Sequence, residues 1–144
     1  MQKIEKEMKA AQHLLYVSMK YTKTCDVILN LIHRWEQMIG VALDSMMERA
    51  KKKKLIKEIP HAPKPKIDAA LQLFRKEPIV IDTINLYSFF RKVPSCEYKR
   101  EHEFRKNVAL HVLNETEVII DIEKLKEWQA LLENFIKFVR VFIA

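Results

Sequence analysis

The chain contains one glycine, Gly40, among its 144 residues. Tight β-hairpins and phosphate-binding loops depend on backbone positions with a positive φ, which glycine adopts most readily. A chain with so little glycine is therefore expected to use neither structure, and helices are the simplest alternative. The length is that of one ordinary domain with a single hydrophobic core, so we expect one domain over residues 1–144.

The spacing of apolar residues supports a helical first half. Steps of three and four residues predict an amphipathic helix over about the first twenty residues, with Ile4, Met8, Ala11, Leu15 and Met19 on its apolar face. A longer helix is expected to begin at a cap formed by Thr22 or Thr24 and to continue to a cluster of lysines. Its apolar residues are Val27, Ile28, Leu31, Ile32, Trp35, Ile39, Ala42, Leu43, Met46 and Met47. Prolines at 60, 63 and 65 then break the pattern, and a short helix follows.

The second half is also expected to be helical. The tract 79–93 starts with β-branched residues, as strands do, but its later apolar spacing favours a helix from about Asp82. A charged helix is expected over residues 96–113, and a terminal helix capped by Asp121 follows an interruption at 114–120. These elements predict an all-α fold, an antiparallel up-and-down bundle of four long helices plus a short helix in the connection.

The formal net charge of +7 favours a polyanionic partner. Much of the excess lies in residues 48–57 and 63–66, where lysines cluster around the expected connection. We interpret this cluster as a solvated helix end, because cations complement the negative end of the helix dipole. No aromatic residues interleave with these lysines in the sequence, as they would in a site that stacks bases.

Targeting and metal-binding patterns are not evident. Charges interrupt the first twelve residues, and the most apolar tract, FIKFVRVFIA, is short and contains two basic residues, so we expect a cytoplasmic protein without membrane contact. His33 and Glu36 form a single i, i+3 pair, whereas carboxylate-bridged helical metal sites need two. Cys25 and Cys96 fit no metal-binding or redox spacing. We expect no metal and no cofactor.

The stretch RKNVALH, residues 105–111, holds the candidate catalytic residues Arg105, Asn107 and His111. On a helix, Asn107 and His111 would share a face, whereas Arg105 and His111 would lie about 120° and about 9 Å apart. A two-fold dimer could bring two copies of the set to one groove. There the histidine could transfer the proton of a ribose 2′-hydroxyl, and the arginine could stabilise charge on the phosphate. This chemistry requires no metal.

The order of the predicted elements resembles that of the HEPN superfamily (higher eukaryotes and prokaryotes nucleotide-binding domain). FRKNVALH stands near the end of the penultimate long helix, and a loop then leads to the terminal helix IEKLKEWQALLENFIKFV. The segments AAQHLLYVSMKY and LIHRWEQMIGVALDSMMERA are similar to the first two helices of such domains. The mark of the family is an arginine and a histidine separated by four to six residues, often with asparagine near the arginine.

The resemblance implies a homodimer that acts as a metal-independent endoribonuclease of toxin–antitoxin or defence type, often beside a nucleotidyltransferase partner. His111 would be the general acid or base, Arg105 the phosphate stabiliser and Asn107 an orienting group, with Arg100 and Lys106 as supporting contacts. Two alternatives stay open. One is a non-catalytic module for dimerisation or for binding a nucleotide or RNA. In this module His111 would only form a hydrogen bond with a neighbouring backbone or side-chain group. The other is a nucleic-acid binder that uses the lysine-rich connection.

Overall fold

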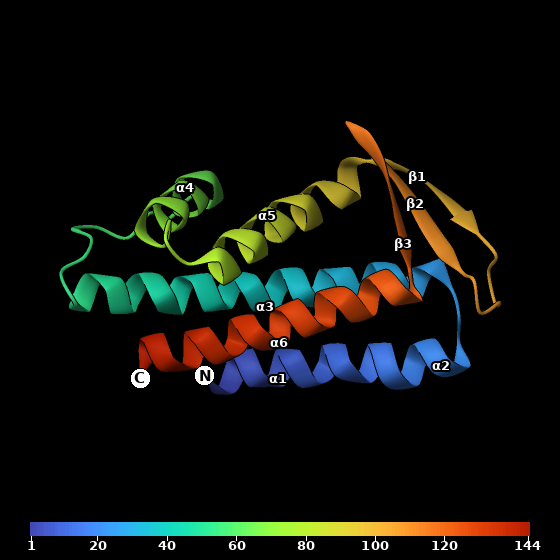
Figure 1. Cartoon of the computed structure of the whole chain (residues 1–144), viewed down its shortest axis with the longest axis horizontal. Helices are drawn as coiled ribbons and strands as arrows, with labels where there is room; N and C mark the ends of the chain where they lie inside the picture. Colours follow the sequence, from blue (N-terminus) through green and yellow to red (C-terminus); the bar gives the residue numbers. More distant parts are fainter.

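The N-terminal half of the chain forms a helical hairpin (Figure 1). The structure is a computed structural model that describes residues 1–144. Helix α1 (Gln2–His13) continues through a π-helical turn (Leu14–Ser18) into α2 (Met19–Tyr21), which confirms the predicted first helix. Helix α3 (Cys25–Lys52) begins where the Thr24 side chain accepts a hydrogen bond from the Val27 N–H. Its 28 residues span about 42 Å, so α3 runs the length of the molecule.

Two proline-initiated helices lie over α3. Helix α4 (Pro63–Leu73) and helix α5 (Pro78–Lys92) each have proline as their first residue, where the missing N–H would have no helical partner. The short helix predicted after the prolines is confirmed as α4. The helix predicted from about Asp82 is also present, although it begins earlier, at Pro78.

The expected all-α bundle is wrong, because residues 97–121 form a three-stranded antiparallel sheet. The strands are β1 (Glu97–Glu101), β2 (Ala109–Asn114) and β3 (Thr116–Asp121), in the order β1-β2-β3, and a short 3-10 turn (Val93–Ser95) precedes them. Val108, Leu110 and Val112 are all fully buried, which is the two-residue period of a strand. The charged helix predicted over 96–113 therefore does not form.

The two turns of this sheet are made without glycine. His102 and Phe104 in the first turn and Glu115 in the second have positive φ values of 54°, 66° and 23°. Residues with a side chain reach this region only at some energetic cost. Scarcity of glycine therefore did not prevent hairpins in this chain.

The final helix, α6 (Ile122–Ile143), follows β3 directly. Its predicted cap is confirmed, since Asp121 Oδ1 accepts a hydrogen bond of 2.8 Å from the Lys124 N–H. The sheet stands at the end of the molecule where α3 and α6 begin, whereas α4 and the last turns of α3 and α6 lie at the opposite end (Figure 1). None of the helices combines the length and apolar character needed to cross a membrane.

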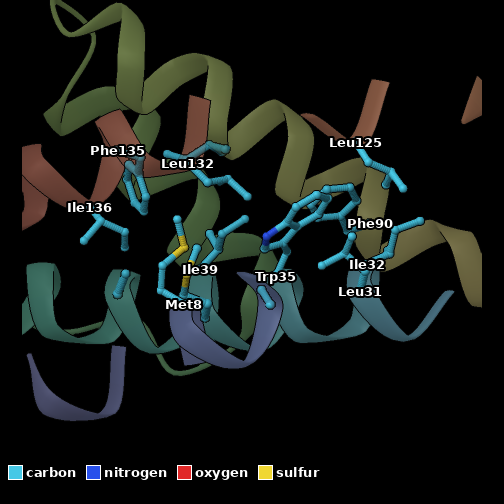
Figure 2. Packing of buried hydrophobic residues seen from close by; sticks show 14 of the residues in the cluster. Met8, Leu31, Ile32, Trp35, Ile39, Phe90, Leu125, Leu132, Phe135 and Ile136 are labelled. Atoms are coloured by element: carbon cyan, nitrogen blue, oxygen red, sulfur yellow. The ribbon is translucent and has the colours of Figure 1, made fainter. Parts of the chain in front are cut away.

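The core lies between α1, α3, α5 and α6, and Figure 2 shows its centre. The Trp35 ring stacks on Phe90 with 5.8 Å between centroids, and the Trp128 ring meets Phe90 edge-on at 5.3 Å. Trp35 and Phe90 are fully buried. Aromatic pairs in such geometries contribute about 0.5–1.5 kcal/mol beyond the burial of their surface. This cluster fixes α5 and α6 against α3, and so fixes the position of the sheet that connects them.

Candidate nucleic-acid interface

The structure separates the three predicted catalytic residues. Arg105 and Asn107 lie in the loop between β1 and β2, and His111 lies in the middle of β2. Asn107 and His111 line the same groove, whereas Arg105 is exposed and does not line it. The helical spacing that related Arg105 to His111 therefore does not apply.

His111 is held between two glutamates on the outer face of the sheet. Its Nδ1 lies 2.6 Å from Glu117 Oε1 on β3, and its Nε2 lies 3.0 Å from Glu101 Oε2 on β1. The imidazole thus joins all three strands, and its side chain is only 14% exposed. We call this arrangement the histidine clasp.

The histidine clasp favours the imidazolium form. The hydrogen bond to Glu117 is the largest influence and raises the pKa of His111 above its ordinary value; burial opposes this rise, and the charge of Glu101 adds to it. Both ring nitrogens already have a carboxylate partner. Proton exchange with a substrate would require at least one glutamate to move away.

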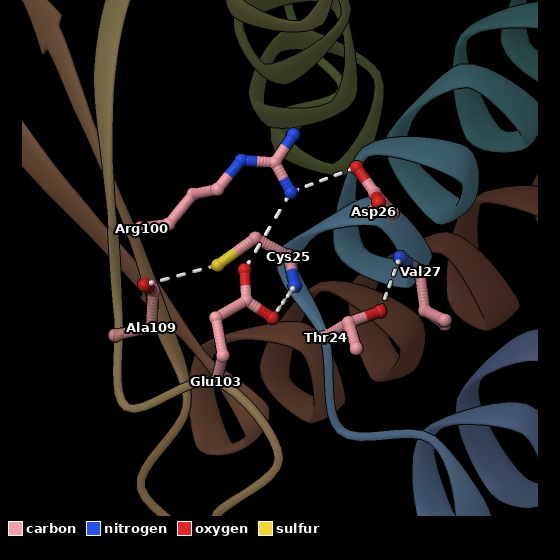
Figure 3. A network of polar contacts seen from close by, with 7 residues as sticks. All are labelled: Thr24, Cys25, Asp26, Val27, Arg100, Glu103 and Ala109. Atoms are coloured by element: carbon pink, nitrogen blue, oxygen red, sulfur yellow. Dashed lines mark hydrogen bonds and ion pairs between the residues drawn. The ribbon is translucent and has the colours of Figure 1, made fainter.

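The loop between β1 and β2 is fastened to the start of α3 (Figure 3). Arg100 Nη1 lies 2.8 Å from Asp26 Oδ1 and 3.5 Å from Glu103 Oε1, and Glu103 Oε2 accepts a hydrogen bond from the Cys25 N–H. Cys25 Sγ donates to the Ala109 carbonyl at 3.3 Å. Arg100, predicted as a supporting phosphate contact, is therefore occupied by two carboxylates and positions the loop.

A groove runs between this loop, the outer face of the sheet and the start of α6. It encloses about 690 Å³, and Lys23, His102, Lys106, Asn107, His111 and Lys126 supply much of its polar lining. Lys23, Ile122 and Lys126 also line a smaller hollow of about 250 Å³ beside the π-helical turn and α2. The two hollows form one continuous surface, which we call the basic groove.

The lysines of the basic groove are free of carboxylate partners. Lys20, Lys23, Lys106 and Lys126 line its two hollows, and none of them forms an ion pair. Lys23 Nζ donates to the Lys20 carbonyl at the end of α2. The carboxylates of Asp121 and Glu123 also lie in the groove, so its net charge is moderately positive.

Three exposed aromatic side chains belong to the same region. Tyr16 lines the smaller hollow and is 52% exposed, whereas Tyr21 and Phe104 are 78% and 76% exposed. The Phe104 N–H donates to the Lys23 carbonyl at 2.5 Å, which fixes the loop beside the groove. Phe104 also has the positive φ described above. A large aromatic side chain is thus held in solvent at a strained backbone position.

Sequence reasoning missed this surface. Its residues come from the π-helical turn and α2, the loop after α2, the loop between β1 and β2, and the start of α6, which are far apart in the chain. Residues 16–23 and 104–106 each place aromatic residues close to lysines in the sequence, which was a local signal of such a surface. Two local signals of the sheet were the alternating apolar residues Val108, Leu110 and Val112 and the β-branched residues of the tract 116–120.

The lysine cluster of residues 48–66 lies at the opposite end of the molecule. Part of its charge is used inside the fold: Arg49 and Lys53 donate to the carbonyls of Ala144 and Phe142, and Lys66 pairs with Asp44. Cations at the last turns of helices satisfy free carbonyls and complement the dipole, which supports the interpretation of this cluster as a helix end.

The chain also offers no obvious metal centre, since no three His, Cys, Asp or Glu side chains gather closely enough to hold an ion. Comparison with protein-family models, curated proteins and solved structures found no match. The function is therefore inferred from the residues and geometry described above, and the resemblance to the HEPN superfamily stays a prediction.

Proposed function

We propose that this protein binds single-stranded RNA in the basic groove without cleaving it. The observation that carries this proposal is the meeting of four lysines without ion pairs and the exposed Tyr16 ring in the basic groove. Two more exposed rings lie beside these lysines: the Phe104 N–H bonds to Lys23, and the Tyr21 ring lies 5.8 Å from Lys20 Nζ. Proteins that bind single strands combine a cationic groove for the phosphates with aromatic side chains on which bases stack.

Each part of the basic groove has a role in this proposal. Lys106 and Lys126 are exposed and would contact phosphates, and the side-chain amide of Asn107 would donate and accept hydrogen bonds with base edges or sugar hydroxyls. Tyr21 and Phe104 would stack on bases, an interaction that contributes about 1–3 kcal/mol per base. Because stacking accepts every base, we expect weak sequence preference.

The histidine clasp supports binding without cleavage. Both nitrogens of His111 face glutamates and Arg105 lies outside the groove, so the predicted Arg105–His111 pair is not assembled. His102 also lines the groove, but no arginine lines it to stabilise charge on a phosphate. Endoribonuclease activity of the HEPN type remains a prediction from the resemblance. It is tested directly by incubating RNA in EDTA with the wild type and with a folded His111→Ala variant.

The expected homodimer and nucleotidyltransferase partner are not needed for this proposal. One chain supplies all of the lysines of the basic groove, its Tyr16 ring and the exposed rings beside it. We therefore expect the same Kd for RNA at protein concentrations below and above the one at which a dimer would form.

The test is a fluorescence anisotropy titration with a labelled oligouridylate of about six nucleotides, within the usual site size of such proteins. The Lys126→Glu variant is expected to lower the affinity about ten-fold at low salt and to flatten the salt dependence. Lys137→Glu is the matched control, because Lys137 is also an exposed lysine on α6 but lies outside the groove. Tyr21→Ser and Phe104→Ser should weaken binding with little change in salt dependence.

Two results would contradict the proposal. Equal losses in Lys126→Glu and Lys137→Glu would show that net charge, and not the groove, controls binding. Cleavage of RNA in EDTA by the wild type but not by His111→Ala would contradict binding without cleavage. It would support the ribonuclease that the resemblance implies.

A further inference from the structure

A second pocket lies at the end of the molecule opposite the basic groove. It encloses about 530 Å³ where the turn after α3, the connection from α4 to α5 and the last turns of α6 meet. No residue that lines it also lines the basic groove. We call it the phenylalanine pocket, and its size is within the range of small-molecule sites.

Aromatic rings form the interior of the phenylalanine pocket. The Phe74 ring meets Phe142 edge-on at 4.9 Å between centroids, and Phe138 stacks on Phe142 at 6.2 Å. Phe74 is only 5% exposed, whereas Val141 and Leu55 at the mouth are 78% and 53% exposed. The pocket thus joins a buried aromatic interior to apolar side chains that are left in water.

The charged residues at the pocket are mostly cationic. Lys53, Arg75 and Lys76 line it together with one carboxylate, Glu77. Lys53 Nζ lies 4.6 Å from the centroid of the Phe142 ring, and Arg75 donates to the Gln72 carbonyl. Lys76 is exposed and has no ion pair or hydrogen bond to its side chain.

We infer that the phenylalanine pocket binds a small amphiphile with an apolar body and one anionic head group. The apolar body would cover the rings and the exposed Val141 and Leu55, and removal of this apolar surface from water favours binding. The head group would face Lys53 and Lys76, where its charge complements the excess of cations. This inference is independent of RNA binding, because the two sites share no residue.

Isothermal titration of the full chain with three ten-carbon probes tests this inference: decanoate and decyltrimethylammonium below their micelle concentrations, and decanol below its solubility limit. Decanoate is expected to bind one site saturably and at least ten-fold more tightly than either of the other probes. Val141→Asp and Lys76→Glu are expected to weaken decanoate binding at least ten-fold, since both place negative charge at the mouth. Both positions are exposed, so the variants should stay folded, which circular dichroism checks.

Lys126→Glu is the matched control, because it should weaken RNA binding and leave decanoate binding unchanged. Similar affinities for the three probes would refute a role for the cations. Absence of saturable decanoate binding, or unchanged binding in both Val141→Asp and Lys76→Glu, would overturn the site itself.

Discussion

Replacement of His111 by glutamine should destabilise the protein in a pH-dependent way. The glutamine can still form hydrogen bonds, but it cannot carry the positive charge that the histidine clasp places between Glu101 and Glu117. The variant therefore isolates the ionic part of the interaction among the three strands.

The expected magnitude follows from the exposure of the partners. Hydrogen bonds to charged groups contribute about 1.5–3 kcal/mol when well protected, and exposed ion pairs about 0.2–1 kcal/mol. His111 is 14% exposed, but Glu101 and Glu117 are 44% and 51% exposed, so solvent screens both contacts. We expect a total loss of about 1–2 kcal/mol in the free energy of unfolding, or about 3–8 °C in Tm.

The sign of the pH dependence is set by the raised pKa of His111. A group with a higher pKa in the folded state stabilises the fold fully below its unfolded pKa of about 6.5, provided that the glutamates stay ionised. This stabilisation is lost as the pH rises through the folded pKa. The difference between wild type and His111→Gln should therefore be largest near about pH 5.5 and should shrink towards about pH 9.

Urea denaturation of both proteins at these two pH values measures the effect. His102→Gln is the matched control: His102 lies 3.9 Å from Glu101, has no second carboxylate partner and is 48% exposed, so its loss should change stability little. An equal difference at both pH values, or an equal effect of His102→Gln, would refute the ionic account of the histidine clasp.

Three further predictions concern single positions. Gly40→Ala should raise the free energy of unfolding by about 0.5–1 kcal/mol in urea denaturation, because a Cβ there would meet the Tyr87 hydroxyl at an ordinary 3.5 Å; a loss would indicate a hidden clash. Burial raises the pKa of Cys25 to about 11, so a thiol reagent at about pH 8 should modify half-buried Cys96 before Cys25, and equal rates would contradict this burial. Asp121→Asn should keep the cap of α6 and remove a carboxylate from the basic groove, so RNA should bind more tightly at unchanged Tm.

Apolar periodicity predicted the helices well because each has one continuous buried face. Along α1, the π-helical turn and α2, the apolar face is buried as its spacing predicts, at Ile4, Met8, Ala11, Leu15 and Met19. The cap at Asp121 was also predicted, and the cap of α3 was narrowed to Thr22 or Thr24, of which the structure uses Thr24, since a polar side chain before an apolar run has a local physical role. Helices and their caps depend on residues that are neighbours in sequence, so the sequence alone is enough to predict them.

The sheet was missed because two local signals pointed the wrong way. Charged residues in β1 can be spaced as on a helix, and the chain lacks the glycines that usually mark hairpin turns. The turns form instead with His102, Phe104 and Glu115 at positive φ, and contacts distant in sequence hold the first of these turns in place. The Phe104 N–H bonds to Lys23, and Glu103 bonds to Cys25.

The candidate site also combines features that the local sequence indicates with features that only distant contacts create. Asn107 and His111 do lie on one groove, but the partners of His111 and the aromatic rings beside the lysines come from other elements. No local pattern around residues 105–111 could show that Glu101 and Glu117 occupy both imidazole nitrogens, because strand pairing brings them there.

Photo-crosslinking with an oligouridylate that contains 4-thiouridine, followed by mass spectrometry of the peptides, tests most directly whether the basic groove binds RNA. Crosslinks to residues 16–23 and 102–107 are the predicted result, because Tyr16, Tyr21 and Phe104 lie there. Crosslinks confined to residues 49–57 would contradict the account, since they would place the RNA on the lysine cluster at the opposite end of the molecule.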